Sequence, residues 1–163
     1  MLDVIEALLG RGPSSRLRAA IIDGGLASQA VANADSRQQS GLFDVYAIAN
    51  AGHTTGDLQA ALEIQVARLR DEPVSADELD KAKTQSIAVL VRRLQTHDNV
   101  AQALVRAAVI QGDPGAVNRL AGEYGAVTAA DVQRVARKYL TVANSTVVAY
   151  QTAAPSGAQG AGK

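Results

Sequence analysis

The residues with the most chemical potential lie in one short loop, GRGPSS at positions 10–15, directly before Arg16. Glycines beside hydroxyls and a cation could cradle a phosphate, present a nucleophile or hold a peptide, or they could only turn the chain. A phosphate loop of the Gly-x-x-x-x-Gly-Lys-Ser type needs a preceding strand and a lysine before the hydroxyl. Here a helical pattern precedes the loop, that lysine is missing and Pro13 removes a backbone donor. The simplest interpretation is a turn that ends one helix and lets Ser14 or Ser15 cap the next.

Other residue types that support catalysis are sparse. The loop serines follow a helix and lack the Gly-x-Ser-x-Gly pattern of a nucleophile elbow. The two histidines, His53 and His97, have no second histidine or cysteine at the spacing of a zinc site. The acidic residues at 77–80 fall where a helix begins, and negative charge there suits the helix dipole. We predict that these residues are capping or solvent-exposed groups.

The amino-acid composition argues against nucleic acid and membranes as partners. The 163-residue chain carries 16 basic and 16 acidic residues, so it lacks the net charge that attracts nucleic acid or an anionic membrane. Aromatic residues make up only 3% of the chain and tryptophan is absent, which disfavours platforms for base stacking. Without cysteine there is no disulfide framework, and no apolar run approaches the length of a membrane span. We expect neither nucleic acid as a partner nor a membrane-spanning segment.

Two strands follow the loop and its second helix. After Leu26 the spacing of apolar residues no longer fits a helix. Residues 27–34 and 42–49 predict two strands joined by a polar turn. This pattern is typical of an antiparallel hairpin. The residues on both faces of the second strand are nearly all apolar, so we expect it to be covered on both sides and central in its sheet.

Helices fill most of the remaining chain. Apolar spacing predicts a helix over 55–70, and Ser75 with Glu78 forms the sequence pattern of a capping box for the next one. We expect Asp98 to cap a further helix with Leu104, Val105 and Val109 turned inward. Asp113-Pro114 predicts a short helix, Thr128 a well-specified one, and residues 146–151 a last strand. The order indicates an α+β fold in which an antiparallel sheet is covered by a layer of helices.

The domain organisation follows from the same pattern. Residues 1–151 are expected to form a single α+β domain, because the apolar content suffices for one core. Between Thr152 and Lys163 the chain consists only of Ala, Gly, Pro, Ser and Gln, and we expect residues 152–163 to be disordered. Met1 falls directly into a helical pattern without a cap, so we expect a fragment of a longer chain.

Five segments, taken in order, resemble one known family. They are "LLGRGPSSRL", "GLA", "SGLFDVYA", "VSADELDKAK" and "VTAADVQRVARKYLTVANSTVV", and the similarity runs from Leu2 to Tyr150. They resemble the pitrilysin/insulinase (M16) family of zinc metallopeptidases, and more narrowly its bacterial branch that is similar to the mitochondrial processing peptidase. The segments with "SSRL" and "VTAADVQRVARKYL" are the most specific.

The resemblance implies where zinc belongs. In that family a His-x-x-Glu-His helix of the first domain holds the metal, and this chain has no such motif. The chain resembles the second, inactive domain, entered after its opening strands. The resemblance therefore implies no cofactor in this chain and zinc in a partner or N-terminal domain. By the same analogy the compartment is the bacterial periplasm or cytoplasm, with the periplasm favoured.

The resemblance also indicates site residues. Active members draw an arginine and a tyrosine from this domain, and the alignment puts Ile22 and Ser28 at those positions, so both groups are lost. In relatives a glycine-rich loop before "SRL" helps to bind the peptide substrate. Glycines expose backbone groups to an extended peptide, and an arginine there could meet an acidic group. The corresponding candidates for substrate binding are Gly10, Arg11, Gly12, Ser14, Ser15 and Arg16.

The resemblance therefore implies a non-catalytic C-terminal domain of a zinc metallopeptidase. It would close a peptide-binding chamber opposite a zinc-bearing domain or subunit, and would be inactive alone. The alternative is a structural or assembly subunit of the same fold with no proteolytic role. Whether the chain forms a dimer stays open.

Overall fold

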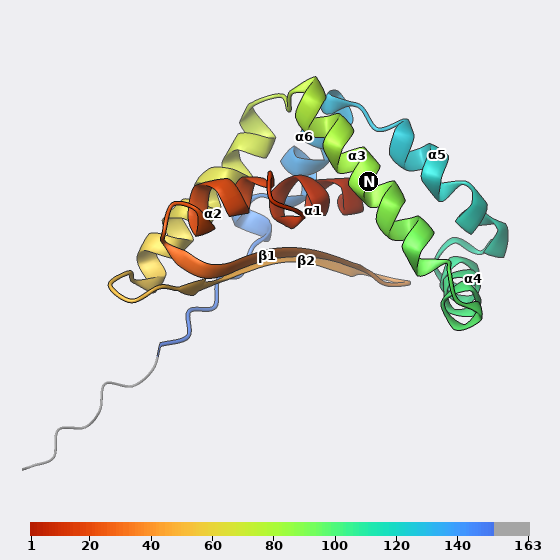
Figure 1. Cartoon of the computed structure of the whole chain (residues 1–163), viewed down its shortest axis with the longest axis horizontal. Helices are drawn as coiled ribbons and strands as arrows, with labels where there is room; N and C mark the ends of the chain where they lie inside the picture. The colour runs from red at the N-terminus through yellow and green to blue at the C-terminus, as the bar shows by residue number, and fades with distance from the viewer. Residues whose placement is uncertain (152–163) are drawn as a thin grey trace, which may run out of the picture.

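Helices gather on one side of a two-stranded sheet in the computed structural model (Figure 1), which describes residues 1–151. The α+β class predicted from the sequence is confirmed, and the tail expected to be disordered lies outside the described residues. The strands are β1 (Ala27–Ser36) and β2 (Gly41–Ala49). The helical elements are α1 (Leu2–Gly10), the π-helix η1 (Arg18–Ile22), α2 (Thr55–Asp71), α3 (Ala76–Arg93), α4 (His97–Gln111), the 3-10 helix η2 (Pro114–Asn118), α5 (Leu120–Gly125), α6 (Ala129–Tyr139) and the 3-10 turn η3 (Val142–Asn144).

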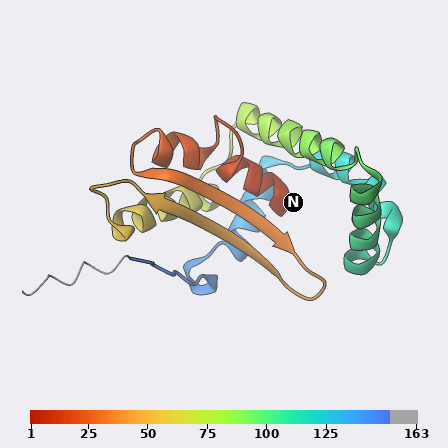
Figure 2. The same cartoon turned by 60° about the horizontal axis from the view of Figure 1, so that its bottom comes forward.

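The predicted hairpin is confirmed. The strands β1 and β2 pair antiparallel from Ser36↔Gly41 to Ala27↔Ala49, with one irregularity near Ala27. The turn between them is closed by a hydrogen bond from Arg37 N–H to Ser40 O. Figure 2 shows the two strands side by side beneath the helices. Each strand therefore has one face toward the helix layer and one face away from it.

The expectation that the second strand is central and covered on both sides is wrong. Within residues 1–151 the sheet has only two strands, so β2 is an edge strand. Leu42, Tyr46 and Ile48 of β2 are 57%, 43% and 51% exposed. The strand expected over 146–151 is wrong as well, because residues 146–151 belong to no strand. An alternating or apolar sequence pattern indicates that a segment can form a strand. It does not show whether another strand pairs with that segment.

Side-chain caps define the helix starts. At α6 the Thr128 hydroxyl accepts from Asp131 N–H while the Asp131 carboxylate accepts from Thr128 N–H, which completes a capping box. Asp113 likewise caps η2, as predicted, by accepting from Gly115 N–H. The prediction of Asp98 as a cap is wrong: Thr96 has the extended backbone of a cap and its hydroxyl accepts from Asn99 N–H.

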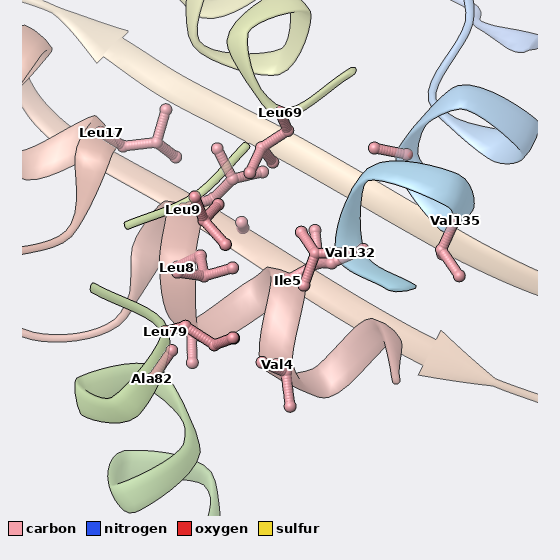
Figure 3. Close-up of a cluster of buried hydrophobic side chains, with 14 of the residues drawn as sticks. Val4, Ile5, Leu8, Leu9, Leu17, Leu69, Leu79, Ala82, Val132 and Val135 are labelled. Carbon is pink, nitrogen blue, oxygen red and sulfur yellow. The ribbon is translucent and has the colours of Figure 1, made fainter. Parts of the chain in front are cut away.

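The core forms where α1 is enclosed by the sheet and the other helices. Figure 3 shows α1 side chains in contact range of those from α2, α3 and α6. The prediction that one face of the first helix is buried is confirmed, because Val4, Ile5, Leu8 and Leu9 are at most 3% exposed. Burying such aliphatic side chains provides the main driving force for this fold. These core residues come from α1, α2, α3 and α6 and include Val4, Ile5, Leu8, Leu9, Leu69, Leu79, Val132 and Val135.

The helix α4 packs differently from the prediction. Leu104, Val105 and Val109 are 40%, 63% and 52% exposed, so they do not turn inward. Its buried contact is Ala107, which packs with Ala116 and Val117 of η2 in a small second cluster. In the described part of the chain, no helix is long and apolar enough to cross a membrane.

Candidate functional site

The loop at positions 10–15 connects α1 to the short turn that leads into η1. A Cβ at Gly10 would lie 2.6 Å from Ala32 N, so glycine lets the end of α1 lie directly against the backbone of β1. Gly12 has a φ of +83°, and a Cβ there would lie 2.7 Å from the Gln85 side-chain nitrogen. Both glycines are therefore explained by local packing and a left-handed backbone.

Arg11 is held by a carboxylate of its own helix. Its guanidinium pairs with Glu6, whose other carboxylate oxygen accepts a hydrogen bond of 3.2 Å from Ala34 N–H. Glu6 thus ties the loop and β1 to α1. An acidic group of a peptide would have to compete with Glu6 for Arg11.

Arg16 is also engaged. Its Nε and Nη2 donate to the two carboxylate oxygens of Glu78 at 2.6 and 2.9 Å, in the two-point geometry that makes such pairs strong. The Arg16 side chain is 10% exposed, and its Nη1 is buried without a hydrogen-bond partner among residues 1–151. Ser75 caps α3 as predicted by accepting from Glu78 N–H, but the Glu78 carboxylate serves Arg16 instead of completing the box.

A shallow pocket of about 240 Å³ lies between this loop and the start of α3. Among the six candidate residues for substrate binding, the pocket brings together Arg11, Ser14 and Ser15, whereas Gly10, Gly12 and Arg16 do not line it. Ser15 is 4% exposed, so Ser14 offers the more accessible hydroxyl. From α3 and its cap, the lining includes Ser75, Asp77, Glu78, Lys81, Ala82 and Gln85.

The two positions assigned to the lost pair lie elsewhere. Ile22 ends η1 and packs half-buried against the core, while Ser28 lies exposed on β1 with its hydroxyl 3.4 Å from Ile48 O. Neither residue lines the loop pocket. An isoleucine side chain has no donor, and a serine hydroxyl reaches far less than a phenol, so neither residue could replace the arginine and the tyrosine that the resemblance leads us to expect there.

The histidines do not gather with other ligands. His53 lies exposed in the turn after β2, and His97 is the exposed first residue of α4. Residues 1–151 contain no group of three or more His, Cys, Asp or Glu side chains placed to hold a metal ion.

The sheet adds a surface that sequence reasoning missed. The face of the hairpin turned away from the helices, here called the open face, carries polar pairs across the strands. Gln29 donates to the Tyr46 hydroxyl at 3.1 Å, and Asn33 donates to Asp44 at 2.9 Å. The alternation of β1, with Gln29, Asn33 and Asp35 on one side, is the sequence signal that could have revealed it.

The comparisons with known proteins agree with this architecture. The peptidase M16 inactive domain family matches residues 1–86 of the chain. Zinc protease PqqE of Helicobacter pylori is 28% identical over 148 residues, which cover 90% of this chain and 33% of that protein. This chain therefore spans about a third of the length of that curated relative.

Two solved structures share the fold over nearly the whole chain. The inactive peptidase domain of a protein described as a zinc protease from Bordetella parapertussis is 28% identical with a TM-score of 0.77, covering 94% of this chain and 84% of that one. A similarly described protein from Bordetella pertussis Tohama I is 26% identical with a TM-score of 0.80, covering 93% and 83%. The chain belongs to the peptidase M16 inactive domain family.

Proposed function

We propose that this chain is the non-catalytic C-terminal domain of a zinc metallopeptidase and closes a peptide-binding chamber opposite a zinc-bearing domain. Membership of the inactive-domain family supports a role beside a zinc site rather than at one. The relative from Helicobacter pylori is a zinc protease about three times as long as the matched region, since that region is 33% of it. The polypeptide that carries the zinc site is called the zinc-bearing polypeptide below.

The observation that carries the proposal is the one-sided layering of the fold. Helices pack on one face of β1 and β2, and the open face is left without a covering element among residues 1–151 (Figure 1). Exposed Tyr46, Leu42 and Ile48 alternate there with the polar Gln29 and Asn33. A wall with apolar patches and hydrogen-bonding groups suits an extended peptide, which offers both side chains and backbone groups.

In this arrangement the zinc-bearing polypeptide and this chain have different roles in peptide hydrolysis. Zinc, when bound in the zinc-bearing polypeptide, supplies an activated water and polarises the scissile carbonyl. The residues of this chain orient the bound peptide and exclude water from the chamber. Because Ile22 and Ser28 stand at the positions of the lost pair, we propose that this chain adds no direct contact to the reacting carbonyl.

We propose the loop pocket as a second contact with peptide. Arg11 and Arg16 are neutralised by Glu6 and Glu78, so they hold the loop in shape. Ser14 and Lys81 line the same pocket, and Lys81 has no ion pair in the described part of the chain. These two side chains are the groups left to meet a polar or acidic side chain of the peptide.

Two tyrosines of matched exposure test the open face. Tyr46 on the open face is 43% exposed and Tyr139 on α6 is 45% exposed. In the peptidase assembled from this chain and the zinc-bearing polypeptide, Tyr46→Ala should raise the KM for a peptide about threefold or more, whereas Tyr139→Ala should leave it unchanged. Equal KM values for both variants and the unmodified chain would refute the open face as a chamber wall. Stable assembly without any peptidase activity would instead favour the structural subunit.

A further inference from the structure

The open face carries two aspartates of the hairpin, Asp35 and Asp44, which differ in their charged neighbours. Asp35 is neutralised by two arginines, because Arg37 Nε lies 2.8 Å and Arg106 Nη2 lies 3.9 Å from its carboxylate oxygens. Asp44 on β2 forms no ion pair within residues 1–151. Its negative charge is therefore left without a counter-charge in the described part of the chain.

Asn33 holds the Asp44 carboxylate in a defined orientation. The two residues are opposite each other in the strand register, and Asn33 Nδ2 donates to Asp44 Oδ2 at 2.9 Å. An ionised carboxylate can only accept hydrogen bonds, so this contact uses the donor group of Asn33 and one oxygen of Asp44. The second oxygen, Oδ1, accepts no hydrogen bond from residues 1–151. One carboxylate oxygen is thus fixed by the hairpin, and the other is available to a ligand.

The neighbours of Asp44 along β2 on the open face offer apolar surface. Leu42 and Tyr46 stand two residues before and after it, about 7 Å away along the strand, so their side chains share its face. They are 57% and 43% exposed. An alkyl chain can lie along such a surface while its charged end reaches a carboxylate, and a tyrosine ring attracts a cation over its face. This combination suits a lysine side chain, which is a flexible alkyl stem that ends in an ammonium group.

We propose that Asp44 binds a lysine side chain of the peptide substrate on the open face, with Leu42 and Tyr46 in contact with the lysine stem. This inference rests on the proposed function and names the side chain that the chamber wall selects. Charge complementarity favours a cation, because Asp44 has no counter-charge among residues 1–151. The geometry favours lysine over arginine. A guanidinium binds a carboxylate most strongly through both oxygens, but Asn33 already occupies Oδ2, whereas an ammonium group needs only one oxygen.

A lysine scan of the substrate tests the proposal in the peptidase assembled from this chain and the zinc-bearing polypeptide. One lysine is moved along a fluorogenic peptide that is otherwise uncharged, and glutamine or arginine takes the same position in matched peptides. At one position lysine should lower KM about fivefold relative to glutamine with kcat unchanged, as expected for a partly screened charge contact. Arginine should bind less tightly than lysine there. Equal KM values for lysine and glutamine at every position, or a preference for arginine over lysine, would overturn the proposal.

A substitution of nearly equal shape assigns the effect to Asp44. Asp44→Asn removes the charge but keeps an oxygen that accepts from Asn33, so the contact across the strands is retained. This variant should lose the fivefold preference for lysine over glutamine. The matched control Asp35→Asn removes a carboxylate that Arg37 and Arg106 already neutralise, so the preference should stay within about twofold of its original value. Equal effects of the two substitutions would refute the assignment to Asp44.

Removing Asn33 tests whether one free oxygen sets the choice between lysine and arginine. Asn33→Ala frees Oδ2 of Asp44, so both carboxylate oxygens can meet a guanidinium. The KM of the arginine peptide divided by that of the lysine peptide should therefore fall about threefold in this variant. An unchanged ratio would contradict the selection of lysine through a single oxygen.

The variants also separate this inference from the proposed function. If Tyr46→Ala raises KM for every peptide while Asp44→Asn leaves the preference for lysine unchanged, the open face remains a chamber wall and the lysine site is refuted. If neither substitution changes KM for any peptide, both the proposed function of the open face and the lysine site fail. A preference for lysine that disappears in Asp44→Asn, together with a higher KM for every peptide in Tyr46→Ala, supports both.

Discussion

Arg16 and Glu78, 62 positions apart in the sequence, form a two-point ion pair that fastens the glycine loop to the first turn of α3. The pair explains two features of the site together. It diverts the Glu78 carboxylate from the capping box, and it removes Arg16 from the groups available to a ligand. The loop that first suggests a binding element is therefore held in shape by its own charged residues.

Breaking this ion pair should destabilise the domain. Glu78→Gln leaves the Arg16 guanidinium, which is 10% exposed, without its counter-charge, and the free energy of unfolding should fall by about 2 kcal/mol. Urea unfolding measures the loss. The control Glu72→Gln removes a pair with Arg68 whose side chains are 56% and 51% exposed, and it should cost about 0.5 kcal/mol or less. Equal losses would show that the Arg16 pair is no more than a surface contact.

Two glycine substitutions should act in opposite directions. At Gly10 a Cβ would meet the Ala32 backbone nitrogen at 2.6 Å, so Gly10→Ala must move α1 away from β1 and should cost about 2 kcal/mol. At Gly122 in α5 a Cβ meets nothing within 4 Å, so Gly122→Ala should stabilise by about 0.5 kcal/mol or more through helix propensity. Thermal unfolding of both variants shows whether each substitution stabilises or destabilises the domain. Stabilisation by Gly10→Ala would contradict the close contact of α1 with β1.

The capping box of α6 should make stability depend on acid. Hydrogen bonds from the Thr128 side chain, then from Arg134 and the Thr128 backbone, lower the pKa of Asp131 to about 2 from 3.8. Because the folded pKa lies below the unfolded one, the stabilisation is present above about pH 4 and disappears as the pH falls through 2. Acid unfolding followed by circular dichroism should show a weaker pH dependence between these values for Asp131→Asn.

The matched variant for this prediction is Thr128→Ala. It removes the largest cause of the lowered pKa, so it should flatten the same part of the acid profile and cost about 1 kcal/mol at neutral pH. An acid profile identical to that of the unmodified chain in both variants would exclude the capping box as its source.

The loop pocket should influence peptide binding through Lys81. In the assembled peptidase, Lys81→Ala should raise the KM for a peptide with acidic side chains about threefold and leave kcat unchanged, as expected for a partly screened charge contact. Lys83 lies on the same helix outside the pocket lining, and Lys83→Ala should have no effect. The same KM change for neutral and acidic peptides would argue against a charge contact.

Local chemistry made much of the fold predictable. The helix starts at Thr128 and Asp113, the buried face of α1 and the β1–β2 hairpin depend on residues close in sequence, and all appear as predicted. The α+β class followed because these elements leave few arrangements for one core.

The features that the sequence did not predict correctly depend on residues far apart in the chain. The role of Glu78 depends on Arg16, and the exposure of β2 depends on which strands are available to pair with it. Apart from Asp44, the residues on both faces of β2 are nearly all apolar, yet within residues 1–151 no strand pairs with its outer edge, so an apolar pattern alone does not establish a central position. At the site, the sequence indicated the loop but not that Glu6 and Glu78 occupy its arginines.

The most direct test is a titration of peptidase activity. A fixed amount of the zinc-bearing polypeptide is mixed with increasing amounts of this chain, and hydrolysis of a fluorogenic peptide is followed. The rate should rise about tenfold or more and saturate at one chain per zinc-bearing polypeptide, while this chain alone with added zinc stays inactive. Chelator-sensitive hydrolysis by this chain alone, or a rate that does not change on its addition, would contradict the account.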